Sequence, residues 1–354
     1  MQIDFHHTVT YVCARLAGFD DQAAQTIAYA AQYVDDATNS GLIRFDNGAL
    51  FRRISSAHKL FDYRNFQDLA NYQVWLPFHF LPGNGGLPAG QDPAGGFIEK
   101  LICRANSPIA QELVAQCISK ANASYGLHWL GITLHVYADT WAHQGFAGVN
   151  HQVNQASRLL NAVGQEDVGL LDRLKGYFIG EALPLGHGAV LGNPDKPYLR
   201  WAYTNGCGEA IQRDNPQEFI AAVEAMVQVM QRFRLRDAQA IVPGLDSRDR
   251  DTIYTTLTEF TEPSSHKRHR QWLARIASGY FSFGAAAINY IPKGKGSWKH
   301  QSLGTEQDVD RDDDVFTYSP TFLKSDWKLF HDALQAHHFY VIHELLPQYG
   351  ICVA

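Results

Sequence analysis

The sequence has few of the features that mark disulfide-rich secreted proteins or membrane proteins. Its 354 residues include only five cysteines, an odd number with no CxxC spacing, which favours reduced core residues over a disulfide framework. No apolar run reaches the length of a membrane span, and the opening letters MQIDFHH lack the basic and apolar regions of a signal peptide. We therefore expect a cytoplasmic protein by default, with secretion without a leader as the alternative.

The sequence also lacks the excess of positive charge that nucleic-acid-binding proteins usually carry. Lys and Arg number 30 against 36 Asp and Glu, which gives a formal charge of −6 and a pI near 6.2. The basic runs are short, HKRHR at residues 266–270 and KGKGSWKH at residues 293–300. Because a groove that follows phosphates needs clustered Lys and Arg, nucleic acid is disfavoured as a partner.

Alternating strand patterns are weak and internal repeats are lacking, whereas helical periodicity recurs along the chain. The predicted helices cover residues 20–36 (with Asp20 as N-cap), 107–146, 151–163, 167–179, 215–235, 246–260, 266–278 and 325–346. An all-α fold is the expected class. Two long irregular segments, residues 76–96 and 182–198, contain His79 and His187. Loops of this length inside a compact domain are usually functional or flexible.

The stretch GLHWLGITLHVYADTWAHQGF, residues 126–146, predicts a buried helix that carries polar groups at regular spacing. His135, Asp139 and His143 follow one another at i, i+4 and i+8, so their side chains form a ridge along one side of the helix. A carboxylate has two oxygens, so Asp139 can share one metal ion with His135 and face a second ion nearby. The spacing indicates a multinuclear metal site, and hydrogen-bonded core histidines are the alternative.

Further candidate ligands lie upstream of this helix. The periodicity of the first residues turns His6 toward the core, with His7 adjacent to it. The next helix ends in YVDD, and its apolar face directs at least one of Asp35 and Asp36 inward. Carboxylates are unfavourable near the negative C-terminal end of a helix, so a cation is expected opposite them. His58 follows in the segment SSAHKL.

The order of these residues resembles that of the zinc-dependent phospholipase C/P1 nuclease superfamily. The likeness is carried by an H-x3-D helix, here His135 to Asp139, which is preceded by the letters LG as in the family. The letters ADTWAHQGF, with a further histidine four residues after the aspartate, are most similar to the heterokaryon-incompatibility C branch. The resemblance covers residues 1–200 and implies an all-α, metal-binding catalytic core there. Residues 201–354 have no counterpart in it and are expected to form a helical extension packed on that core.

The resemblance implies three zinc ions in a cleft. The first ion is expected at Asp35 or Asp36, His58, His135 and Asp139; the second at Asp139 and His6 or His7; the third at His143 and His187. Secreted members of the family bind zinc through an N-terminal amino group, for which Asp4 is the expected substitute. Leu191 stands where the family carries an acid of the third site, which leaves Asp195 as the candidate. Two to three Zn²⁺ ions suit such ligands, with Mn²⁺ or Fe²⁺ as alternatives.

The expected activity is hydrolysis of phosphodiester bonds, because metal ions with open positions activate water and polarise a phosphoryl oxygen. Asp139 and one of Asp35 and Asp36 are the candidate catalytic groups that orient the attacking water. A phospholipid or another small phosphodiester is the favoured substrate. The aromatic loop at residues 74–86 is expected either to form an apolar rim for peripheral membrane contact or to pack on the protein through Trp75, Phe78 and Phe80. The alternatives are a P1-type nuclease and a non-catalytic scaffold that metal ions stabilise.

Overall fold

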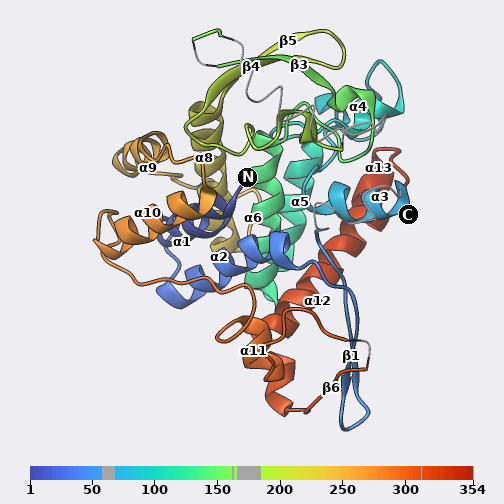
Figure 1. Cartoon of the computed structure of the whole chain (residues 1–354), viewed down its shortest axis with the longest axis vertical. Helices are drawn as coiled ribbons and strands as arrows, with labels where there is room; N and C mark the ends of the chain where they lie inside the picture. Colours follow the sequence, from blue (N-terminus) through green and yellow to red (C-terminus); the bar gives the residue numbers. More distant parts are fainter. Residues whose placement is uncertain (58–67, 162, 166–184, 312, 354) are drawn as a thin grey trace.

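The computed structural model describes the chain except residues 58–67, 162, 166–184, 312 and 354. The described chain is mostly helical, as the periodicity predicts (Figure 1). The longer helices are α2 (Asp21–Asp36), α3 (Asp68–Phe78), α5 (Pro108–Ser119), α6 (Gly126–Ala142), α8 (Asn215–Leu235), α9 (Ser247–Glu259), α10 (Ser265–Ala277) and α12 (Asp326–Phe339). The shorter α-helices are α1 (Thr10–Leu16), α4 (Phe97–Leu101), α11 (Trp298–Leu303) and α13 (Leu346–Gln348). Two π-helices are η1 (Asp4–Val9) and η7 (Tyr340–Leu345), and 3-10 turns lie at η3 (Asn84–Gly86), η4 (Gln152–Asn154), η5 (Gly188–Val190) and η6 (Pro320–Lys324).

Most of the predicted helices are confirmed to within one or two residues. Asp20 caps α2 by accepting a hydrogen bond from the backbone N–H of Ala23 at 2.8 Å. Helices α8, α9 and α10 match three predicted helices, and the last predicted helix is α12 continued by η7. Residues 107–146 form two helices, α5 and α6, because the chain turns at residues 120–125. The helix predicted over residues 167–179 lies outside the described part of the chain.

Two three-stranded sheets show that the fold is not purely all-α. In the first, with the order β2-β1-β6, β1 (Gly41–Phe45) is antiparallel to β2 (Leu50–Arg53) and parallel to β6 (Val315–Phe316). The second has the order β3-β4-β5 and is antiparallel, with β3 (Ala156–Leu160), β4 (Arg200–Asn205) and β5 (Ala210–Asp214). The two sheets lie at opposite ends of the molecule (Figure 1).

The strands correct the sequence prediction for a physical reason. Strand β3 lies within residues 151–163, which were expected to be helical, and it is held by pairing with β4, which is distant in sequence. Such pairing overrides a weak local helical pattern. The loop that joins β1 and β2, residues 46–49, contains Asn47-Gly48 with φ of +86° at Gly48, and a turn of this composition is a hairpin signal.

Helix α6 is the centre of the fold, and every residue from His128 to Ala142 is buried. Helices α2, α5, α8 and α12 pack around it (Figure 1). Helix α2 crosses so closely at Gly131 that a Cβ atom there would lie 2.4 Å from the carbonyl oxygen of Ile27. A glycine is therefore required at the crossing. The close approach brings the C-terminal end of α2 beside His135.

Elements from the C-terminal half of the chain contribute to the same core. Helix α8 packs against α1 and α6, α12 packs against α6, and α10 packs against η1. Buried apolar side chains from both halves, such as Ile27, Leu134, Val223 and Phe330, belong to one continuous cluster. Within the described ranges, no helix combines the length and the apolar character that crossing a membrane requires.

Candidate metal centre

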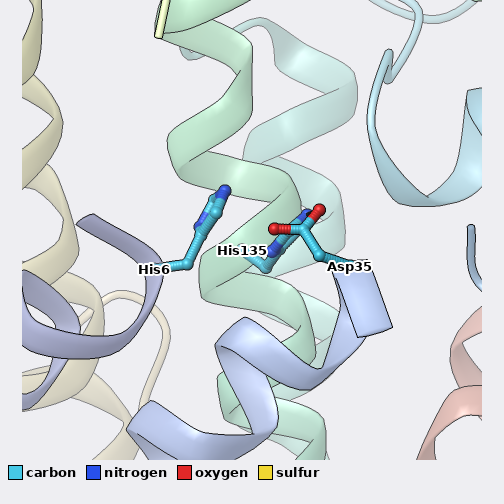
Figure 2. Close-up of side chains that lie close together, drawn as sticks. All are labelled: His6, Asp35 and His135. Carbon is cyan, nitrogen blue, oxygen red and sulfur yellow. Dashed lines mark ion pairs between the residues drawn. The ribbon is translucent and has the colours of Figure 1, made fainter. Parts of the chain in front are cut away.

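Three groups of histidine and aspartate side chains lie along α6. Within each group, one ligand atom from every member lies within 4.8 Å of the others. The groups are His6, Asp35 and His135; His79, His135 and Asp139; and His143, His187 and Asp195. Figure 2 shows the first group, in which the side chains of η1, α2 and α6 approach one another. Because His135 belongs to two groups, the first two form one continuous cluster.

Four of the imidazole rings are oriented by backbone carbonyl groups. The donating nitrogens and their acceptors are His135 Nδ1 with Ala31 O at 2.8 Å, His79 Nε2 with Ser56 O at 2.9 Å, His143 Nδ1 with His79 O at 2.7 Å, and His187 Nδ1 with Leu191 O at 2.6 Å. A carbonyl oxygen only accepts, so the hydrogen of each neutral ring resides on the nitrogen facing the carbonyl. The other nitrogen of each ring is therefore left with a lone pair that faces the cluster. Rings that bind metals in proteins are commonly fixed in this way.

His135 Nε2 and His79 Nδ1, the ring nitrogens that do not face a carbonyl group, lie next to each other. His135 Nε2 lies 3.2 Å from His79 Nδ1 and 3.4 Å from Asp139 Oδ2. Burial lowers the pKa of His79, which disfavours an extra proton on that ring. Acceptor atoms at these distances repel one another unless a cation lies among them. The arrangement therefore suits a metal ion.

Asp139 is the shared acid of the cluster, with a side chain that is 1% exposed. Its Oδ1 atom contacts the Met1 amino group and lies 3.1 Å from His6 Nε2, whereas Oδ2 lies 3.6 Å from His79 Nδ1. Burial alone raises the pKa of Asp139, but His143, the amino group and His135 outweigh it and hold the pKa well below the usual range. The two oxygens face different ligand groups, which is the geometry of a bridging carboxylate.

The nitrogen of Met1 lies inside the cluster. In addition to its contact with Asp139, it is 3.2 Å from Asp195 Oδ1 and 3.5 Å from His143 Nε2. Burial alone lowers the pKa of this amino group, but the two carboxylates outweigh it and raise the pKa to about 11. Asp4, the expected substitute for an amino group, is not a member of any of the three ligand groups. Asp4 instead pairs with the guanidinium of Arg268, with Nε 2.5 Å from Oδ2.

The third group lies beyond the C-terminal end of α6. Asp195 Oδ1 is 3.4 Å from His143 Nε2, and Asp195 Oδ2 is 3.5 Å from His187 Nε2. Leu191 turns the chain with a φ of +51°, and its carbonyl accepts the hydrogen bond from His187. This turn brings Asp195, the acid left as a candidate by the sequence, back to the two rings.

Of the neighbours His6 and His7, only His6 points into the cluster. Its ring stacks on that of His135 with a centroid separation of 3.8 Å. His6 Nε2 faces Asp139 Oδ1 at 3.1 Å, although neither ring nitrogen of His6 has a described partner with full hydrogen-bond geometry. His7 Nδ1 lies 3.0 Å from His269 Nε2, on the side of α10. Successive residues of a helix point in different directions, which separates the two rings.

Of the neighbours Asp35 and Asp36, only Asp35 points into the cluster. Asp35 Oδ1 lies 3.8 Å from His79 Nδ1 and 3.9 Å from His135 Nε2. Asp36 turns away and accepts a hydrogen bond from the hydroxyl of Tyr290 at 2.6 Å. The same rotation between successive helical residues explains this separation.

A family model matches residues 1–345 of the chain and is described as a family of unknown function, DUF6765. The chain belongs to this family. No curated protein and no solved structure matched it. The family description gives no activity, so the function of this DUF6765 chain has to be argued from its site.

His79 is a member of the DUF6765 cluster that the sequence did not predict as a ligand. The predicted ligand His58 lies outside the described residues. His79 immediately follows α3, where its ring reaches Asp139 and its carbonyl orients His143. The only signal in the sequence was that His79, like His187, lies in one of the two long irregular segments. Ligand spacing along a helix gives no information about a loop residue.

The aromatic loop of the DUF6765 chain does not form the expected apolar rim. Phe78 is fully buried and stacks on His337, and Phe80 is buried with its ring 4.5 Å from that of His143. These rings therefore pack behind the ligands. Trp75 is half-buried, with its ring 5.1 Å from that of His79.

Proposed function

We propose that the protein is a metal-dependent hydrolase of phosphodiester bonds that holds two to three zinc ions along α6. The observation that carries the proposal is the mutual contact of three acceptors, His135 Nε2, His79 Nδ1 and Asp139 Oδ2. A cation is the simplest partner for such a buried set. Imidazole nitrogen with carboxylate oxygen suits zinc, and Mn²⁺ and Fe²⁺ are the alternatives.

The proposed assignment gives each ion at least three protein ligands. The first ion would take Asp35, His79, His135 and Asp139; the second would take His6, Asp139 and the Met1 amino group, which must release a proton to bind a metal ion; the third would take His143, His187 and Asp195. In this assignment His79 takes the place for which the sequence predicted His58. Asp139 keeps the bridging role that its two oxygens permit.

Partial exposure of two side chains of the cluster supports catalysis over a purely structural role. The side chains of Asp35 and His187 are 33% and 20% exposed, whereas that of His135 is 0% exposed. Structural zinc sites are closed by protein ligands, and catalytic sites keep a position open to water or substrate. A non-catalytic scaffold would be expected to bury all of its ligands equally.

The side chains of the cluster would have different roles in hydrolysis. Bound metal ions would lower the pKa of a water molecule and polarise a phosphoryl oxygen. Asp35 reaches the solvent side and is placed to accept a hydrogen bond from the attacking water. Asp139 is fully buried and fixes the separation of the ligand groups, while the Phe80 ring excludes water from behind His143.

The proposed substrate class is a small phosphodiester, with a phospholipid head group preferred. The net charge of −6 disfavours a polynucleotide. The resemblance of the H-x3-D helix to the zinc-dependent phospholipase C/P1 nuclease superfamily supports the lipid preference, although a shared fold does not by itself fix a substrate. The half-buried ring of Trp75 lies beside that of His79 and is the proposed aromatic contact for such a substrate.

The test is hydrolysis by protein of known metal content. Zinc-loaded protein is incubated with phosphatidylcholine, phosphatidylethanolamine, a chromogenic phosphodiester, single-stranded DNA and RNA. We expect cleavage of a phospholipid or the small diester, loss of activity with a chelator, and recovery with Zn²⁺. Cleavage of nucleic acid alone would favour a P1-type nuclease. Inactivity on every substrate with the metals present would favour the scaffold.

A further inference from the structure

Arg268, on α10 in the C-terminal half of the chain, makes a buried contact with the first residues of the chain. Its Nε atom donates to Asp4 Oδ2 at 2.5 Å, and Nη2 donates to Asp4 Oδ1 at 3.1 Å and to Gln2 Oε1 at 2.8 Å. The side chains of Arg268 and Asp4 are 0% and 2% exposed. The guanidinium therefore holds two alternate residues of the N-terminal segment at once.

The Nη1 edge of the guanidinium also makes hydrogen bonds. Nη1 donates to the carbonyl oxygen of Glu262 at 2.7 Å and to that of Pro263 at 3.2 Å. The guanidinium carbon also lies 5.8 Å from the ring of Tyr198, three residues after Asp195. Arg268 consequently joins α10, the N-terminal segment and the segment that supplies the third ligand group.

The residues that Arg268 holds are those that determine the positions of two candidate ligands. The carbonyl of Gln2 accepts backbone hydrogen bonds from Phe5 at 2.8 Å and His6 at 2.9 Å, so Gln2 sets the first turn of η1. The Met1 nitrogen lies one residue before Gln2, and His6 lies two residues after Asp4. A shift of Gln2 or Asp4 therefore moves both ligands away from Asp139.

The contact is poorly explained as a source of stability alone. A buried ion pair loses most of its attraction to the cost of desolvation, and an apolar replacement of similar volume is often as stable. Burial raises the pKa of Asp4 even though the adjacent guanidinium opposes the shift, which reflects that cost. A planar group with donors at fixed angles is, in contrast, well suited to fixing the positions of several acceptors.

We propose that Arg268 is a positioning residue that sets the Met1 amino group and His6 against Asp139, so that α10 completes the metal centre. This inference rests on the proposed function, because it requires that the cluster binds metal. It assigns a role at the site to the part of the chain for which the sequence indicated only a helical extension.

The experiment compares Arg268→Lys with Arg53→Lys in the full-length protein. Lysine keeps the charge but cannot hold Asp4, Gln2 and the two carbonyls together. Arg53 is a matched control, since it is also buried and paired with an acid, Asp310 at 2.6 Å, and contacts none of the proposed ligands. Zinc affinity is measured by competition with a chromogenic chelator, and the melting temperature is measured on metal-free protein.

We expect Arg268→Lys to weaken the binding of at least one zinc ion by about 10- to 100-fold, as for other residues that orient metal ligands. Arg53→Lys should keep wild-type affinity even if both variants lose similar stability without metal. Asp4→Asn, which keeps the size of the side chain, should reproduce the loss if Arg268→Lys does not fold. Wild-type zinc affinity in whichever variant of the pair folds would overturn the inference while leaving the proposed function intact. Failure of the wild-type protein to bind zinc would overturn both.

Discussion

His135 Nε2 lies 3.2 Å from His79 Nδ1, and each ring donates its N–H to a backbone carbonyl on its opposite side. When both rings are neutral, imidazoles oriented in this way present lone pairs to each other. The backbone thus fixes a repulsive contact at the centre of α6, where Asp139 adds a carboxylate oxygen 3.4 Å from His135. The predictions below test whether metal ions relieve this repulsion.

Asp139→Asn is expected to reduce the number of bound metal ions per chain more than a substitution of any single histidine does. Asp139 is the acid shared by two proposed ions, and asparagine loses the charge and one acceptor oxygen. Wild-type protein purified without chelators should contain two to three metal ions per chain. The variant should lose at least one more ion than His187→Ala.

The melting temperature should fall together with the metal content. An ion whose free concentration is 1,000 times its Kd adds about 4 kcal/mol to the free energy of unfolding. Elemental analysis and calorimetry measure both, and full metal content in Asp139→Asn would contradict the bridging role.

His6→Ala and His7→Ala form a pair of neighbouring substitutions with opposite expectations. His6 stacks on His135 and faces Asp139, whereas His7 contacts His269 on the far side. We expect His6→Ala to lose one metal ion per chain and His7→Ala to retain the wild-type number. The measurement is elemental analysis of both proteins after the same dialysis. Equal metal content in the two variants would place the site elsewhere.

Asp35→Asn and Asp36→Asn make the corresponding pair for activity. Asp35 is the partly exposed acid of the cluster, so its amide should lower kcat by roughly 100-fold or more through loss of the water-orienting carboxylate. Asparagine at position 36 can still accept the hydrogen bond from Tyr290, so activity should remain and stability should change by about 1 kcal/mol. Hydrolysis rates of a phosphodiester substrate measure the activity of both variants, and urea unfolding measures the stability of Asp36→Asn. A larger loss in Asp36→Asn would reverse the assignment.

The stability of the protein should fall on mild acidification because of His331. This ring is buried beside Trp327, and burial, with a smaller contribution from Arg53, lowers its pKa from 6.5 to about 3. The unfolded chain takes up a proton below pH 6.5 and the folded chain does not until about pH 3, so the stabilisation is complete above pH 6.5 and is lost as pH falls. At pH 5 the loss amounts to about 2 kcal/mol. Urea unfolding of His331→Gln at pH 7 and pH 5 should show a smaller decrease than the wild type, and identical decreases would exclude His331 as the cause.

Local sequence rules predicted those features of the fold and of the site that depend on a single helix. The i, i+4, i+8 spacing of His135, Asp139 and His143 fixes their common side as soon as α6 forms. The N-cap at Asp20 and the bounds of α8 to α10 are equally local. Strand β3 could not be predicted in this way, because its partner β4 is supplied by a distant segment.

The sequence by itself determined a mostly helical chain with a ligand ridge on its central helix and a short set of candidates for the remaining ligands. Only the tertiary structure selected among them. Where α2 crosses α6 at Gly131, Asp35 faces the cluster and Asp36 faces away from it. The orientation of η1 likewise directs His6, and not His7, toward His135. His79 and the Met1 nitrogen belong to segments that are not related by helical periodicity to His135, Asp139 and His143. Their positions depend on contacts across more than 50 residues of chain, such as that of His79 with His135, which no local pattern encodes.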